Sequence, residues 1–366
     1  LSGTETYGSI DWEYLHDEHG HVKITGFTSA TEVTADVHQD QYGNSRLPDS
    51  AVGSGNANTR WSLGAFDGDQ GFPRAVAFYE ERLYFAGTSG QPQTIFGSKT
   101  ADFENMTPGT NDDDAINVTI ASDQVNVIKH MIQGRFLQLL TSSAEFTLSG
   151  GTGTQPVTPT NVNVLRETTF GSSAVRPIRA GSSTILIQKG QEKVKEVTFD
   201  LDTDGLVGRD LTILAEHIAR GGLTDMIWQQ EPELVLWFVR NDGTLIGLSY
   251  DPQNQVIGWH SHPMAGTGTV DSITAIRSGE EDQVYLSVKR TIDGSTVRHI
   301  VFMEKIYFGT DVDDAFFVDS GLTYDSTATT TITGLNHLEG ETVQILADGS
   351  AHADKTVSGG AVTLDR

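Results

Sequence analysis

Alternating apolar and polar residues, interrupted every few positions by turn residues, run through most of this chain. The clearest stretch covers residues 71–103, where Ala75–Tyr79 and Arg82–Gly87 both have the pattern of a β-strand. Glu80 and Glu81 separate them, which predicts two antiparallel strands that reverse direction at a charged tip. A further short strand is expected over Gln93–Gly97, after a break of Gly and Pro.

The same pattern recurs along the rest of the chain, with turn signals about ten residues apart, which is typical of an all-β protein. Positive-φ residues that tight hairpins require are expected at Asn241-Asp242-Gly243 and Asp293-Gly294. The other predicted strands are Val22–Phe27, Glu32–Val37, Phe136–Thr141, Glu145–Ser149, Thr184–Gln188, Lys193–Phe199, Leu234–Arg240, Leu245–Tyr250, Val256–His260, Val284–Lys289 and Arg298–Phe302.

One helix is predicted, over Thr212–Ala219. Ile213, Leu214 and Ile218 have the spacing of an apolar stripe, and the pair Gly221-Gly222 is expected to end the helix.

The predicted hairpins group into units of about forty to fifty residues, a period that is typical of propeller blades. These units begin near Ala75, Val127, Arg179, Thr224 and Ser272. Four-stranded sheets repeated radially form a β-propeller, and we predict such a core over residues 70–320. A pair of β-sandwiches is the alternative, because it also produces many short strands.

Two smaller β-rich regions flank this predicted core. Residues 1–69 contain two strand candidates and then a polar run over Gly53–Thr59, which suggests a loop or a domain junction. Residues 321–366 begin with a Thr- and Ser-rich segment. The alternation over Leu338–Leu364 then predicts a small separate β-module, with strands in ETVQILADG and AVTLDR.

Composition suits a large extracellular or virion protein. The chain has 366 residues, 39 glycines and no cysteine, so it can form a sizeable core but no disulfide. No run approaches 18 apolar residues, so no membrane span is expected. The chain starts at Leu1 without a charged and apolar leader, so no signal peptide is expected, and a start without Met is typical of a fragment or a processed product.

The formal charge is −25, from 49 acidic and 24 basic residues. Such a surface repels nucleic acid and argues against a groove that grips phosphates. One interpretation is an acidic surface that only keeps the protein soluble. The other is a channel that carries DNA, whose walls of like charge let the duplex slide without Lys or Arg contacts that would hold it.

The order of several short phrases resembles one protein family. Residues 71–103 combine a Gly-aromatic-Pro-Arg-Ala opening, an Arg-Leu-aromatic-Phe-Ala-Gly strand, a Pro-Gln-Thr segment and a Ser followed by Asp102 and Phe103. The phrases that follow this stretch along the chain are Asp112–Ile116, Ala121–Ile128, Asp210–Gly222, Trp228–Gln230, Leu236–Gly243 and Gly258–His260. In the order of these phrases, over about residues 71–302, the chain resembles the tail nozzle proteins, also called tail tubular protein B, of short-tailed bacteriophages and prophages.

This resemblance implies a structural virion protein of the phage tail, made in the bacterial cytoplasm. It implies a homo-hexameric ring that is attached to a tail tube or adaptor ring and carries fibres or spikes on its flank. DNA would pass through the channel during ejection without specific binding. It also implies that residues 1–69 form a β-rich platform.

Searches for catalytic chemistry find no G-x-S-x-G, no phosphate-binding glycine loop and no H-E-x-x-H. His260 and His262 fall on one face of a predicted strand, an arrangement that can begin a metal site, although a polar strand end after Trp259 is favoured. The acidic runs Asp112-Asp113-Asp114 and Asp311, Asp313, Asp314 offer oxygen ligands for a hard cation, but neither has the Gly and distal Glu of an EF-hand, so a solvated turn is favoured.

Aromatic and basic residues are assigned structural roles. Trp228, Trp237 and Trp259 lie in apolar strand runs, so core packing is favoured over sugar stacking. Arginines beside strands or turns are expected to pair with acids or to cap carbonyls; they are Arg82, Arg135 and Arg240. We therefore assign no catalytic, cofactor-binding or metal residues and expect no enzyme. The alternatives are a virion-associated glycan-degrading or glycan-binding tail protein, since 49 acids always offer carboxylate pairs, and a receptor-binding module.

Overall fold

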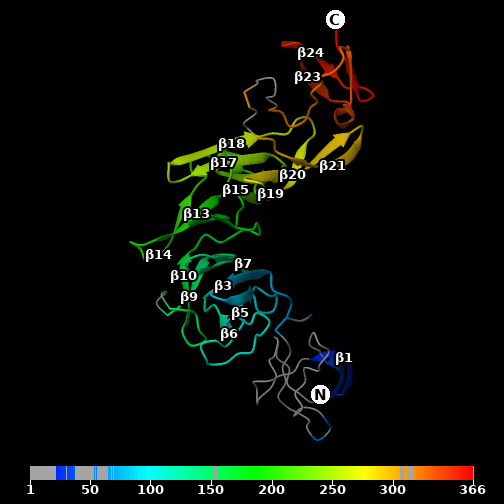
Figure 1. Cartoon of the computed structure of the whole chain (residues 1–366). Helices are drawn as coiled ribbons and strands as arrows, with labels where there is room; N and C mark the ends of the chain where they lie inside the picture. Colours follow the sequence, from blue (N-terminus) through cyan, green and yellow to red (C-terminus); the bar gives the residue numbers. More distant parts are fainter. Residues whose placement is uncertain are drawn as a thin grey trace. The chain divides into compact units, whose positions relative to one another are not determined.

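The computed structural model describes residues 22–29, 31–37, 53, 55, 65–66, 68, 70–151, 153, 155–305, 309–310 and 317–365. These residues are almost entirely β-structure, so the all-β prediction is confirmed (Figure 1). The chain divides into two compact units. The first unit comprises Leu1–Lys189 and Glu196–Arg209, and the second comprises Gly190–Lys195 and Asp210–Arg366.

The first unit contains three four-stranded antiparallel sheets in succession, after the small hairpin of β1 (Val22–Ser29) and β2 (Glu32–Val37). The first blade is β3 (Ala75–Tyr79), β4 (Arg82–Ala86), β5 (Thr94–Gly97) and β6 (Ile116–Thr119). The second blade is β7 (Ile128–Gln133), β8 (Leu137–Thr141), β9 (Glu145–Gly150) and β10 (Val162–Thr168). The third blade is β11 (Ile178–Ala180), β12 (Ser183–Ile187), β13 (Val194–Asp200) and β14 (Gly205–Asp210).

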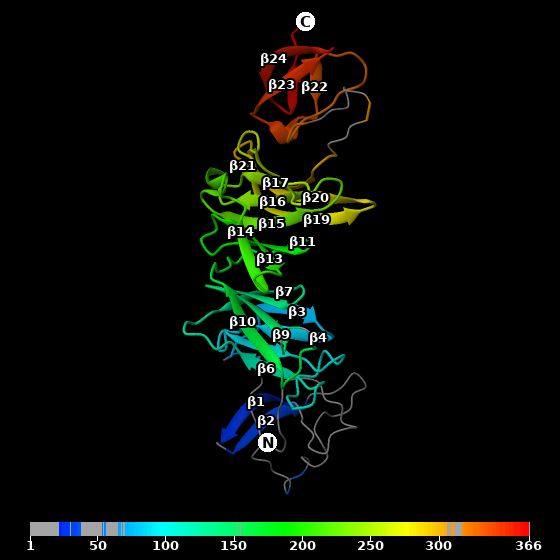
Figure 2. The same ribbon diagram turned by 90° about the vertical axis from the view of Figure 1, so that its left-hand side faces the viewer.

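The second unit contains a fourth blade, a three-stranded fifth blade and a terminal module (Figure 2). The fourth blade is β15 (Leu223–Gln229), β16 (Val235–Arg240), β17 (Leu245–Asp251) and β18 (Val256–His262). The fifth blade is β19 (Thr269–Ser278), β20 (Glu281–Ile292) and β21 (Ser295–Phe302). The terminal module pairs β22 (Thr331–Thr333) with β25 (Ala361–Thr363) and β23 (Thr342–Ala347) with β24 (Ser350–Thr356), and it includes the 3₁₀ turn Asn336–Leu338.

Each blade is an up-and-down meander in which every strand pairs with its neighbours in sequence, without the crossovers of a Greek-key sandwich. This is the topology of β-propeller blades, and the propeller prediction is confirmed at this level. The blades begin within a few residues of the predicted starts. The domain boundaries predicted after residues 69 and 320 stay predictions.

Within each unit, apolar side chains fill the space between consecutive blades. Tyr84 and Ile95 of the first blade pack with Leu139 and Phe146 of the second. Other clusters join the second blade to the third and the fourth to the fifth. The terminal module has its own core around Leu335, Leu338, Val357 and Val362, as expected of a separate module.

The predicted helix is wrong in its extent. Only α1, Glu216–Ala219, is helical, while Ile213 and Leu214 are 67% and 95% exposed. The cause is local, because Asp210 accepts hydrogen bonds from both the amide and the hydroxyl of Thr212 and so fixes a turn there. The predicted stop holds, since both glycines after the helix have positive φ.

Candidate functional site

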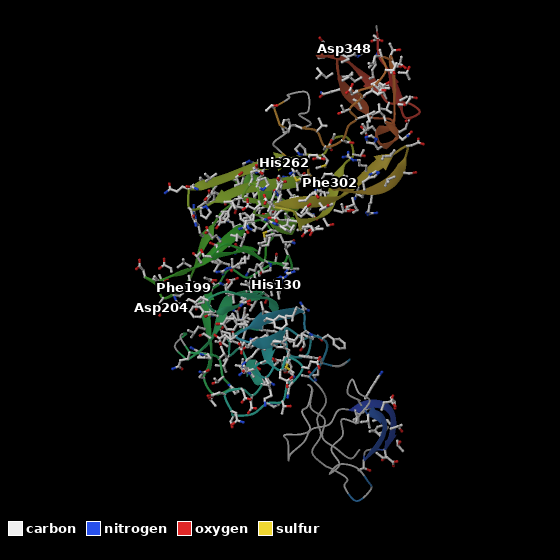
Figure 3. All side chains as sticks on the ribbon, viewed as in Figure 1. His130, Phe199, Asp204, His262, Phe302 and Asp348 are labelled. Carbon is white, nitrogen blue, oxygen red and sulfur yellow. The ribbon has the colours of Figure 1, made fainter. Side chains whose placement is uncertain are left out.

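The histidine pair of β18 lies in the packed layer between the fourth and fifth blades. His260 and His262 point to the same face, and one ring donates an N–H to the other across 2.6 Å between His260 Nδ1 and His262 Nε2. The buried Trp237 ring lies 5.6 Å and 5.2 Å from the two imidazole centroids. Figure 3 labels His262 among these side chains. Desolvation lowers the pKa of both rings, and for His260 the neighbouring His262 lowers the pKa further.

A glycine in the next strand makes room for this pair. Gly247 is the register partner of His260, and a Cβ there would lie 2.0 Å from His260 Cε1. Among the described residues no group of three His, Cys, Asp or Glu side chains could hold a metal ion. The pair is therefore half-buried and bonded to itself, with two nitrogen ligands at most.

The loop that contains the acidic run at residues 112–114 encloses the positively charged side chain of Arg82. Arg82 is 1% exposed, and its guanidinium donates to the carbonyl oxygens of Ser98 at 2.7 Å, Asp114 at 2.6 Å and Asp112 at 2.6 Å, with a longer contact of 3.4 Å to Asp113 O. The prediction that Arg82 caps carbonyls is confirmed. Residues 311, 313 and 314, the second acidic run, lie outside the described residues.

The other arginines also have structural contacts. Arg135 lies over the ring of Phe199, with 4.3 Å between the guanidinium carbon and the ring centroid. Arg240 donates to both carboxylate oxygens of Asp242 at 2.9 Å and 2.6 Å, and this hydrogen bonding lowers the pKa of Asp242. Both arrangements stabilise turns or blade packing.

The tryptophans pack as predicted. Trp237 is 5% exposed and donates to Gln229 Oε1 at 2.8 Å. Trp259 donates to Leu211 O at 2.8 Å, and Trp228 packs edge-on against Tyr250. Their rings are held by the fold and do not form a platform for a sugar.

Two carboxylates at the boundary of the second and third blades were missed by sequence analysis. Glu145 is fully buried, and its Oε2 accepts from Phe170 N at 3.1 Å and from the hydroxyl of Thr168. No described group bonds its Oε1, and desolvation raises the pKa of this carboxyl. Glu167 accepts from Thr147 Oγ1 at 2.7 Å and from Leu206 N at 3.0 Å. An acid at the start of the apolar strand EFTLSG was the available signal for Glu145.

A second missed pattern is the DLDTDG sequence at the hairpin between β13 and β14, which has the alternate carboxylates and the glycine of the first half of a calcium loop. Asp200 Oδ1 accepts from the amides of Asp202 at 2.8 Å and Thr203 at 3.1 Å. Figure 3 places Asp204 at the outer tip of this hairpin. The Asp200 carboxylate thus bonds within its own turn, and the described residues contain no metal-binding group there.

Comparisons with known proteins yield fold likenesses alone. No family model and no curated protein matches the sequence. Human WBSCR16 aligns at 13% identity and a TM-score of 0.34, over 61% of this chain and 63% of that one, so the match spans under two thirds of that protein. The β-propeller domain of Cps50 (Swd1) from Myceliophteria thermophila aligns at 10% identity and a TM-score of 0.36, over 63% and 72%. A luciferin-regenerating enzyme aligns at 13% identity and a TM-score of 0.27, over 63% and 90%.

These TM-scores are all below 0.5 and identify no function. In the part of the chain that the structure describes, no helix is long and apolar enough to cross a membrane.

Proposed function

We propose that this chain is a structural virion protein, one subunit of a ring-shaped nozzle at the end of a short phage tail. The ring forms the distal conduit for DNA ejection, and the subunit has no catalytic role. Six copies surround the channel, bind a tail tube or adaptor ring, and carry tail fibres or spikes.

The observation that carries the proposal is the ordered set of family phrases. Several of them fall on defined parts of the fold: the phrases of residues 71–103 include β3, β4 and β5, Asp210–Gly222 connects the third blade to the fourth, and Leu236–Gly243 covers most of β16 and its turn. The segments that carry the resemblance therefore lie in successive parts of one folded chain.

The charge of the chain supports the same proposal. A net charge of −25 makes adhesion to DNA unfavourable, because the phosphate backbone carries about one negative charge per 1.7 Å of duplex. A conduit needs a wall along which DNA moves without being held.

Two different exposed apolar faces support assembly into a ring. On the first blade Val76 and Phe78 are 60% and 56% exposed, and on the fifth blade Ile276, Ile300 and Phe302 are 54%, 74% and 47% exposed. A contact between unlike patches on neighbouring copies is heterologous and closes into a ring when the rotation permits.

The test is cryo-EM averaging, without imposed symmetry, of the protein in its tail particle or mixed with its tail-tube partner. The expected result is a sixfold ring around an acidic axial channel. Particles with only two-fold dimers, or discrete copies with no channel, would reject the nozzle.

A second candidate is a glycan-degrading tail protein, favoured by one observation. Glu145 and Glu167 are partly or fully buried carboxylates beside the same blade boundary, and Glu145 has a raised pKa, as a general acid requires. Screening against capsular and cell-wall polysaccharides tests it. Hydrolysis that Glu145→Gln or Glu167→Gln abolishes would favour this function, while glycan binding without turnover would indicate a receptor-binding module.

A further inference from the structure

Four basic side chains in the first unit lie close together without an acidic partner. Arg74 immediately precedes β3, Lys129 and His130 belong to β7, and Arg176 lies two residues before β11. Twelve other lysines and arginines form ion pairs with carboxylates, but among the described residues none of these four does. In a chain with 49 acidic residues, a cationic cluster that is left unneutralised calls for an explanation.

Packing of the first strands brings Arg74 to the start of β7. β3 and β7 pack against each other, and Gly87 after β4 lies between them. A Cβ on Gly87 would lie 2.3 Å from Ile128 O and 2.9 Å from Arg74 Cγ. The aliphatic stem of Arg74 therefore lies beside the backbone that leads directly into Lys129.

Hydrogen bonds bring Arg176 to the same place. Lys129 Nζ donates to Ser172 O at 2.8 Å, and His130 Nε2 donates to Ser173 O at 3.2 Å. These two bonds tie β7 to the segment that ends at Arg176. Figure 3 labels His130 in this part of the first unit.

The four groups are near enough to affect one another's ionisation. Burial is the main cause that lowers the pKa of Lys129, and the charge of Arg74 lowers it further. Burial also lowers the pKa of His130, where the hydrogen bond to Ser173 opposes it and the charges of Lys129 and Arg176 add to it. Like charges that face one another are unfavourable until an anion lies between them.

We propose that Arg74, Lys129, His130 and Arg176 form a binding site for a phosphate group. Two exposed guanidinium forks, an ammonium and an imidazole are a donor set suited to a group with three or more acceptor oxygens and nearly two negative charges, more than a single carboxylate offers. The hydroxyl of Ser172, whose residue is fully buried, has no bonding partner among the described residues, and the carbonyl oxygen of the same residue accepts from Lys129 Nζ. The phosphate is either a free phosphate or the backbone phosphate of a nucleic acid, and the proposal does not depend on the nozzle function.

The first measurement is calorimetric titration of the full chain with inorganic phosphate. We expect saturable binding of one phosphate, weakened about a hundredfold in the Lys129→Gln, Arg176→Gln double variant, since each of the two charge-assisted hydrogen bonds contributes about a decade in affinity. Arg220→Gln is the matched control, because it removes one exposed positive charge from the other unit. Its affinity should equal that of the unchanged protein.

The single variant Arg176→Gln covers the case in which loss of Lys129 disturbs folding. Arg176 is exposed and bonds no described group, so the fold should be intact and phosphate binding about tenfold weaker. No saturable binding to the unchanged protein, or equal affinity in the unchanged protein and the Arg176 variant, would overturn the proposal.

A second titration identifies the source of the phosphate. Competition between a short single-stranded oligonucleotide and inorganic phosphate indicates a backbone phosphate. In that case the slope of log affinity for the oligonucleotide against log salt concentration should become shallower by about 0.7 for each cation removed. Binding of inorganic phosphate without competition by the oligonucleotide indicates a free phosphate. Both results support the site, and they distinguish its source only once the first titration has shown saturable phosphate binding.

Discussion

Replacing Arg82 by Met should destabilise the first blade more than any surface change in the chain. Arg82 is fully enclosed, and Met keeps most of its apolar stem while removing the guanidinium. Two of its hydrogen bonds, to Ser98 O at 2.7 Å and Asp114 O at 2.6 Å, are buried, whereas those to Asp112 O and Asp113 O are partly open to solvent. Water can replace the guanidinium only at the partly open carbonyls.

The expected magnitude follows from the two buried bonds. A hydrogen bond to a charged group contributes about 1.5–3 kcal/mol, so their loss should lower the free energy of unfolding by about 3–6 kcal/mol. Arg82→Lys keeps the charge but lacks the fork, so an ammonium that reaches fewer carbonyls should recover about half of this loss. Urea unfolding followed by circular dichroism measures the change. Hydrogen exchange of the amides of Thr100 and Asp114, which bond within the same loop, localises it.

Arg220→Met is the control, because Arg220 is exposed and should change the free energy of unfolding by less than about 0.5 kcal/mol. A loss below about 1 kcal/mol for Arg82→Met, or unchanged exchange at Thr100 and Asp114, would refute the argument that the arginine replaces a bound cation in this loop.

Three other outcomes are expected. Burial lowers the pKa of His260 and His262, so just below the ordinary histidine pKa of 6.5 the unfolded chain binds more protons than the folded chain. The free energy of unfolding should therefore fall as the pH drops through that value. In urea titrations at several pH values, the double variant His260→Gln, His262→Gln should show a flatter dependence of the free energy of unfolding on pH. Gly247→Ala should cost about 1–3 kcal/mol in the same assay, since its Cβ meets His260, while Gly258→Ala, with open space around it, should not. Phe78→Ser should leave the melting temperature nearly unchanged, because the Phe78 side chain is 56% exposed. It should reduce assembly into the oligomeric ring, which analytical ultracentrifugation measures.

Local signals were sufficient to predict the blades. The strand Ala75–Tyr79 was predicted with its observed bounds, because alternation and the charged turn at Glu80 and Glu81 both lie within a few residues of it. Both tip residues have positive φ, as the tight reversal requires. The first strands of the second, third, fourth and fifth blades were predicted only as unit starts, since their own patterning is less regular than that of the hairpins that follow them.

The helix failed for the opposite reason. Its apolar spacing was genuine, but the side chain of Asp210 offers Thr212 a competing turn, and Trp259 of a distant strand bonds Leu211 O. Neither hydrogen bond can be predicted from the spacing of apolar residues. Such failures occur where a polar side chain satisfies the backbone before a helix can.

The cationic cluster shows why a site built on repeated blades resists prediction from sequence. Arg74, Lys129 and Arg176 are about fifty residues apart along the chain, and no local pattern distinguishes them from the other basic residues. They converge because each lies in or close to the first strand of a consecutive blade, β3 packs against β7, and hydrogen bonds join β7 to the segment before β11. A repeat that places equivalent positions side by side can gather single charges into one patch. In a chain with an excess of acids, the lack of an acidic partner for this patch among the described residues is a stronger indication of an anion than the number of positive charges.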